Sequence, residues 1–113
     1  MMYNNLTSAN IYCIVNSSGE LQAQLSVSGI KGRTTQIHVE LYVEKKILGL
    51  FWSRVDIGYT NNVWVDSTTN HTYSHSFITS LPSTGTYRTT VTFTVSGTGG
   101  SDDVIVKTDT VTH

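Results

Sequence analysis

Hydrophobic and polar residues alternate along several stretches of the chain, most clearly over residues 87–95. In an extended strand this segment places Tyr87, Thr89, Val91, Phe93 and Val95 on one face, and Arg88, Thr90, Thr92 and Thr94 on the other. A side-chain period of two is typical of a half-buried β-strand. The same alternation recurs over residues 20–28 and 36–44, so it predicts an antiparallel β-protein and no helix in the first half.

Turn-forming residues divide the chain at intervals of about ten residues. We expect further strands over residues 9–15, 63–66, 71–78 and 103–111, the last with Val104, Ile105 and Val106 as its apolar centre. Seven to eight short strands at this spacing predict an all-β fold, an immunoglobulin-like antiparallel β-sandwich. With 113 residues and no linker or internal repeat, the chain is expected to form one β-sandwich domain over residues 1–113.

The segment Ile47-Leu48-Gly49-Leu50-Phe51-Trp52 breaks the alternation because it is apolar throughout. Such a run fits a strand that is buried on both faces, or a hairpin that turns at Gly49. The preceding Lys45-Lys46 and the glycine both disturb a simple ladder of strand pairs. They therefore favour a hairpin or a bulged strand.

The segment Leu81-Pro82-Ser83-Thr84-Gly85-Thr86-Tyr87 carries a second motif. Its Gly-x-Tyr after a turn resembles the tyrosine corner of immunoglobulin and fibronectin type III domains, whose tyrosine hydroxyl bonds back to the turn. Thr89 stands where an antibody domain has its second cysteine, and Leu41 where it has its core tryptophan. The resemblance is therefore to a sandwich without the disulfide.

The first five residues of this motif, 81–85, also match the LPxTG signal that sortases cleave. That signal needs an unfolded position before an apolar segment and a basic tail, whereas here a predicted strand follows at once. We interpret Pro82 and Gly85 as turn residues between two strands.

The chain is also similar to a family of small exported bacterial proteins of unknown function. The resemblance rests on Phe51-Trp52, Trp64, the Leu81-x-x-x-Gly85-x-Tyr87-Arg88 motif and Gly99-Gly100-Ser101-Asp102, and it implies no activity. Only 13% of the residues are charged, and Thr, Ser, Asn and Gly take their place, as in many extracellular β-proteins. We therefore expect a secreted protein whose signal peptide has been removed.

Charge and cysteine content exclude several classes of function. The net charge is −1, so no overall basic field attracts nucleic acid or anionic lipid. No apolar run has the length of a membrane span. Cys13 is the only cysteine, so no intramolecular disulfide can form, and its apolar neighbours predict a buried, inert thiol.

No pattern in the sequence indicates an enzyme, a cofactor or a metal site. The motif Gly-x-Ser-x-Gly is absent. His71 and His75 on one strand would lie about 13 Å apart, too far to share an ion. Asp102-Asp103 after Gly99-Gly100 fits either a loop that binds calcium or a hairpin turn capped by aspartate. The second interpretation needs no ligand.

The remaining functional signal is aromatic, because Trp52, Tyr59 and Trp64 fall close together between turn residues and charges. Exposed rings of this kind stack on sugars or anchor protein partners, whereas buried ones fill the core of a sandwich. The sequence leaves both alternatives open for the tryptophans. It predicts a non-catalytic extracellular binding module for a protein or cell-surface glycan, or alternatively a carbohydrate-binding module with an aromatic platform.

Overall fold

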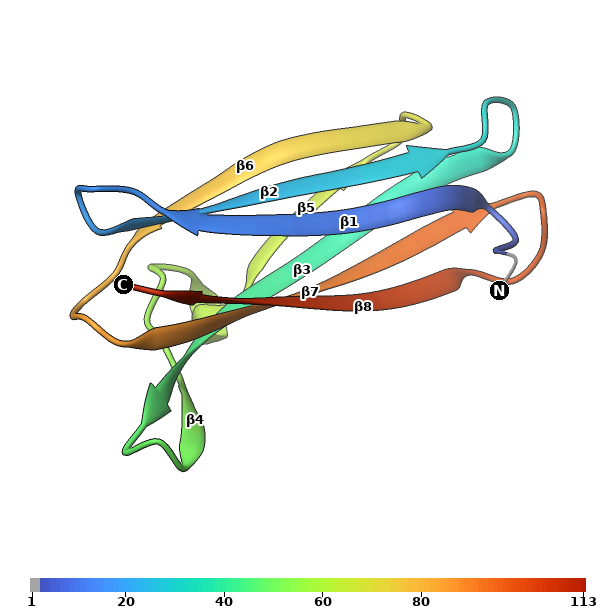
Figure 1. The fold of residues 1–113 in the computed structure, drawn as a ribbon. Helices are drawn as coiled ribbons and strands as arrows, with labels where there is room; N and C mark the ends of the chain where they lie inside the picture. Colours follow the sequence, from blue (N-terminus) through green and yellow to red (C-terminus); the bar gives the residue numbers. More distant parts are fainter. Residues whose placement is uncertain (1–2) are drawn as a thin grey trace.

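The computed structural model describes residues 3–113, and it folds them into two antiparallel β-sheets that pack face to face (Figure 1). The smaller sheet has the order β1-β2-β6, with strands β1 (Leu6–Val15), β2 (Glu20–Gly29) and β6 (Thr72–Ser80). The larger sheet has the order β4-β3-β7-β8, with β5 also paired to β3; its strands are β3 (Thr34–Ile47), β4 (Phe51–Arg54), β5 (Trp64–Thr68), β7 (Thr86–Gly97) and β8 (Asp103–Thr112).

The predicted β-sandwich of seven to eight antiparallel strands is thus confirmed, with eight strands in the described part of the chain. The helical structure described in residues 3–113 is one short turn, η1 (Thr60–Asn62). Met1 and Met2, which belong to the single domain expected over residues 1–113, lie outside the described residues.

The core forms between the inner faces of the two sheets. The inward side of β7 follows the predicted alternation, because Tyr87, Thr89, Val91, Phe93 and Val95 are all fully buried. Leu21 and Leu25, on the opposite sheet, belong to the same hydrophobic cluster. Each such large apolar side chain contributes about 1.5–3 kcal/mol when it leaves water, so this double layer stabilises the domain.

The last strand corrects one expectation from the sequence. Val104 and Val106 do not belong to the apolar centre of β8, because their side chains are 64% and 59% exposed. Ile105 between them is buried. Since successive residues of a strand point to opposite faces, three apolar residues in a row cannot all face the core of a sandwich.

The edges β1 and β8 lie side by side and connect the two sheets (Figure 1). The backbone amide of Cys13 donates a hydrogen bond to Asp109 Oδ2 at 2.7 Å. The amides of Asn4 and Asn5 donate to the two carboxylate oxygens of Asp103, at 3.0 and 2.6 Å. These bonds fix the beginning of the chain against its last strand.

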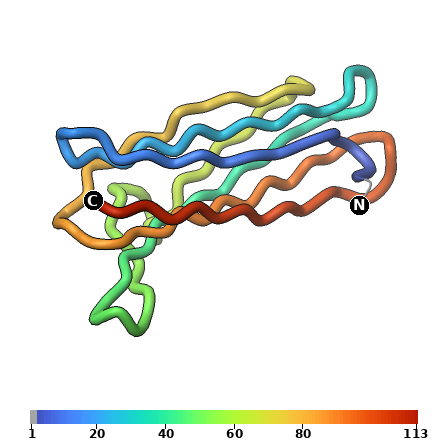
Figure 2. Tube along the Cα trace, in the orientation of Figure 1, coloured from blue at the N-terminus to red at the C-terminus, as the bar shows by residue number. Residues whose placement is uncertain are grey.

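The β3–β4 hairpin projects from one end of the sandwich, as the green segment of the tube shows (Figure 2). Of the hairpin and the bulged strand that the sequence favoured here, the structure has the hairpin. The turn closes with a hydrogen bond from the Leu50 amide to the Ile47 carbonyl at 2.9 Å. Its two central residues, Leu48 and Gly49, have φ angles of 53° and 65°. Positive φ at both central positions is what a type I′ turn requires.

Candidate functional site

Trp64 is a core residue, although the sequence left its position open. It pairs across the ladder with Leu41, on the inner face of the larger sheet, and is 9% exposed. Its indole stacks on His75 with ring centres 4.8 Å apart and contacts Phe77 at 5.3 Å. Trp64 therefore fills the side of the sandwich between β5 and β6, as the structural alternative for the tryptophans predicts.

Tyr59 meets the expectation that at least one of the three rings is exposed. It lies in the loop after β4, just before η1, and is 51% exposed. One edge of it contacts Phe77, with ring centres 6.4 Å apart. Binding of a ligand by Tyr59 stays a prediction.

Trp52 lies on the outer face of the larger sheet, beside the base of the hairpin, and is half-buried. The guanidinium of Arg88 lies over its ring at 4.3 Å, and the ammonium of Lys46, its cross-strand partner, at 5.8 Å. Arg88 also donates to Glu44 Oε1 at 2.8 Å. Two cations thus cover much of the indole, and these cation–π contacts hold it in place.

The three predicted rings therefore do not form one platform. Trp52 occupies the outer face of the larger sheet and Trp64 the inner face, while Tyr59 lies in a loop. A flat sugar ring needs aromatic faces that are accessible from the same side. Among the described residues, Tyr59 supplies the most accessible of the three candidate rings.

The structure shows an apolar surface that the sequence analysis did not select. Leu48, Leu50 and Phe51 are 84%, 80% and 54% exposed at the end of the hairpin. We call residues 48–51 the hairpin tip. The sequence does contain a signal for this surface, which is the apolar run around Gly49. The signal was ambiguous, because the same run also fits a buried strand.

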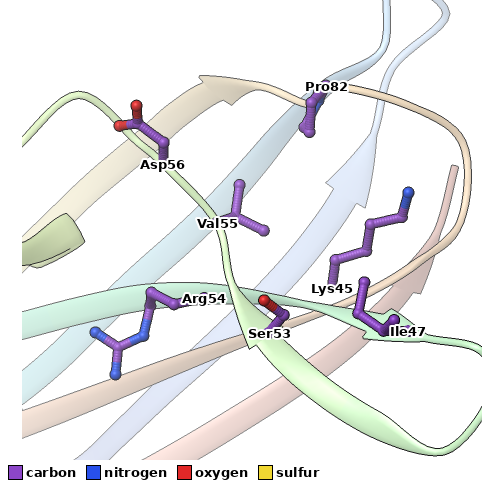
Figure 3. A pocket seen from close by; sticks show the side chains of 7 residues that line it. All are labelled: Lys45, Ile47, Ser53, Arg54, Val55, Asp56 and Pro82. Carbon is purple, nitrogen blue, oxygen red and sulfur yellow. The ribbon is translucent and has the colours of Figure 1, made fainter.

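The hairpin is supported on its inner side by the loop between β6 and β7. The ammonium group of Lys45 donates a hydrogen bond to Ser83 Oγ and lies 5.9 Å from the centre of the Tyr87 ring. Between hairpin and loop lies a pocket of about 260 Å³ (Figure 3). Its lining is mixed apolar and charged and consists of Lys45, Ile47, Ser53, Arg54, Val55, Asp56 and Pro82.

The loop between β6 and β7 is the predicted tyrosine corner. The Tyr87 hydroxyl donates to the Ser83 carbonyl at 2.7 Å. The amide of Leu81 donates to the Gly19 carbonyl, and Gly85 exchanges two hydrogen bonds with His113. The Leu81–Gly85 segment that matches the sortase signal is therefore part of the folded domain and does not form an extended, free peptide.

Burial makes the Cys13 thiol and the Tyr73 hydroxyl weaker acids than they are in water. Burial raises the pKa of the Cys13 thiol to about 11, against a smaller lowering by Thr89 and with a further rise from Asp109. The thiol therefore stays protonated at neutral pH, and a protonated thiol is a poor nucleophile. Burial, followed by the hydrogen bond to Asp66, also raises the pKa of the Tyr73 hydroxyl.

Asp103 has a structural role, but not that of the cap on a hairpin turn which the sequence offered, because its partners are the distant Asn4 and Asn5. Both carboxylate oxygens of Asp103 accept hydrogen bonds from backbone amides, and Asp102 is exposed beside it. Within residues 3–113, no group of three His, Cys, Asp or Glu side chains is placed to hold a metal ion. No helix in the same range is long and apolar enough to cross a membrane.

Comparison with known proteins adds no assignment. No protein-family model matches the sequence, and a search of curated proteins found no significant match. The functional argument therefore depends on the exposed surfaces of this chain alone.

Proposed function

We propose that this protein is a non-catalytic extracellular interaction module whose contact surface is the hairpin tip. The proposal depends chiefly on Leu48, which is 84% exposed and has a φ of 53°. A non-glycine residue in the left-handed region costs about 1–2 kcal/mol, because its Cβ approaches the following carbonyl oxygen. Leu48 therefore has an unfavourable backbone conformation although its side chain contributes little to the core.

The neighbouring side chains extend the argument. Type I′ turns favour Asn-Gly, whereas this hairpin has Leu48-Gly49. Leu50 and Phe51 add two further exposed apolar side chains at the same tip. Contiguous apolar side chains on a surface are typical of sites that bind a partner, and residues that violate local preferences concentrate at functional sites.

The test is the stability of Leu48→Asn, which converts the turn to Asn-Gly. Because asparagine tolerates a positive φ, we expect the free energy of unfolding to rise by about 0.5–1 kcal/mol in urea denaturation. Leu50→Asn is the matched control, since it removes an equally exposed leucine without relieving a positive φ, and should leave stability unchanged. A loss of stability in Leu48→Asn would show that Leu48 serves the fold and would remove the proposal.

Carbohydrate binding through Tyr59 is the second candidate, and the 51% exposure of its ring favours it. A single exposed phenol can stack on one sugar residue. The test is a glycan array with the wild-type protein and Tyr59→Ala. Binding that depends on Tyr59 would support this candidate, and binding equal in both proteins would remove it.

A further inference from the structure

We infer that the hairpin tip binds the surface of an anionic lipid bilayer, an inference that rests on the proposed role of the tip as contact surface. The hairpin projects beyond the sandwich (Figures 1 and 2). It ends in Leu48, Leu50 and Phe51, three exposed side chains. Apolar side chains on a projecting loop can enter the boundary between lipid headgroups and acyl chains.

Basic residues gather directly behind the tip. Four of the seven lysines and arginines of the chain lie at this end of the larger sheet: Lys45, Lys46, Arg54 and Arg88. Two carboxylates, Glu44 and Asp56, lie among them, so the positive charges outnumber the negative ones by two. The net charge of −1 for the whole chain therefore conceals a local excess of positive charge. Basic groups near an anionic membrane surface each strengthen binding.

The spacing along the hairpin matches the depth of an interface. Lys46 lies two residues before Leu48 at the turn, which at the rise of a β-strand is about 7 Å. Membrane-surface segments bury their apolar groups about 5–10 Å deep. When the leucines reach that depth, the Lys46 ammonium lies at the level of the phosphates. Trp52, which pairs with Lys46, then lies at the interface, where indoles concentrate in membrane proteins.

A bilayer fits this surface better than a folded partner does. Each partner in a stable protein complex contributes about 800 Å² of surface, far more than three side chains at a hairpin tip supply. A fluid lipid surface needs no matching concave pocket. The contacts of Trp52 with Arg88 and of Lys45 with Ser83 hold the hairpin from both sides, so it keeps its shape without a partner.

The experiment is co-sedimentation with lipid vesicles. One set contains equal parts of phosphatidylglycerol and phosphatidylcholine, and the other contains phosphatidylcholine alone. We expect the wild-type protein to bind the anionic vesicles, and more weakly as salt is raised. Leu48→Asn should lower the partition coefficient by about tenfold or more, because one leucine no longer enters the apolar region.

Two further variants separate the charge from a general loss of fold. Lys46→Gln should lower binding to anionic vesicles by about fivefold and leave the weak binding to neutral vesicles unchanged. Val104→Asn removes another exposed apolar side chain, 64% exposed, at the other end of the same sheet. It should bind as the wild type does.

Several outcomes would overturn the lipid assignment. These are an absence of wild-type binding to anionic vesicles, or equal binding by wild type and Leu48→Asn. Self-association that sedimentation velocity detects in the wild type and not in Leu48→Asn would instead assign the tip to a second copy of the chain. In each case urea denaturation of Leu48→Asn remains a separate test of the proposed function. A loss of stability in this variant would show that Leu48 serves the fold, whatever the vesicles bind.

Discussion

Two turns lie at the same end of the sandwich: the tyrosine corner between β6 and β7, and the hairpin tip between β3 and β4. Pro82 of the corner lines one pocket together with residues at the base of the hairpin, among them Lys45 and Ser53. In the corner, Pro82 and Gly85 are common turn residues, and the buried Tyr87 binds the turn through Ser83. In the tip, Leu48 occupies a position that favours asparagine or glycine, and its side chain is exposed.

The residues of the corner stabilise the fold, whereas the requirements of the fold do not explain the residues of the tip. Every feature of the corner has a structural reason, so its match to a sorting signal needs no functional one. The tip has apolar side chains that expose more surface than they bury. Local sequence preferences are followed in the first turn and violated in the second, which is why we assign binding to the second.

The largest expected effect tests the comparison directly, by truncating one aromatic ring at each turn. Tyr87→Ala should lower the free energy of unfolding by roughly 3–5 kcal/mol, because it leaves a cavity in the core. Phe51→Ala should change it by less than about 0.5 kcal/mol, as expected for an exposed side chain. Urea denaturation of the two variants measures both values. Similar losses in the two variants would contradict the division into a structural and a free turn.

A smaller change isolates the hydroxyl group of the corner. Tyr87→Phe should cost roughly 1–2 kcal/mol, because it removes the hydrogen bond and leaves the Ser83 carbonyl without this donor. Thermal unfolding measures the difference. A melting temperature equal to that of the wild type would show that the ring alone stabilises the corner.

The base of the hairpin should depend on the contact between Arg88 and Trp52. A double-mutant cycle with Arg88→Ala and Trp52→Ala should give a coupling energy of about 0.5–1 kcal/mol, the usual size of a partly exposed cation–π contact. Trp52→Ala combined with Val104→Ala is the control and should be additive. A coupling near zero for the first pair would mean that the hairpin is held from its inner side alone.

The last prediction is that treatment with sortase leaves the native domain unchanged. Sortase should leave the native domain uncleaved between Thr84 and Gly85, because the hydrogen bonds of the corner keep this segment out of an extended peptide groove. The same five residues on a flexible tail serve as the positive control, and mass spectrometry detects the products. Efficient cleavage of the native protein would show that the corner opens.

The sequence was sufficient where local pattern determines structure. The alternation along β7 predicted the five buried side chains of its inner face, although Thr90 on the other face is buried as well. Gly85-Thr86-Tyr87 predicted the corner with a hydrogen bond back to the turn, whose acceptor is the Ser83 carbonyl. It also favoured the hairpin at Gly49. In each case the deciding information lies within a few residues of the feature.

The sequence was insufficient where burial depends on distant neighbours. Trp52 and Trp64 look alike in the sequence, but β5 pairs with β3 so that Trp64 faces Phe77 across the sandwich, while Trp52 faces outward beneath Arg88. Val104 and Ile105 differ for the same reason of register. A shift of one residue in pairing would exchange the two faces of a strand, and nothing local fixes that choice.

The hydrogen bonds that join Asn5 and Cys13 to β8 connect residues far apart in the sequence, which has a consequence for folding. Asn5 and Asp103 are 98 residues apart, and Cys13 and Asp109 are 96 apart. Until β8 has been synthesised, these amides near the beginning of the chain lack their carboxylate partners, so the two sheets cannot be joined at this edge. We therefore expect the domain to reach its native state only after synthesis of its last strand. Its folding should take milliseconds to seconds, as in other β-sandwiches with distant contacts.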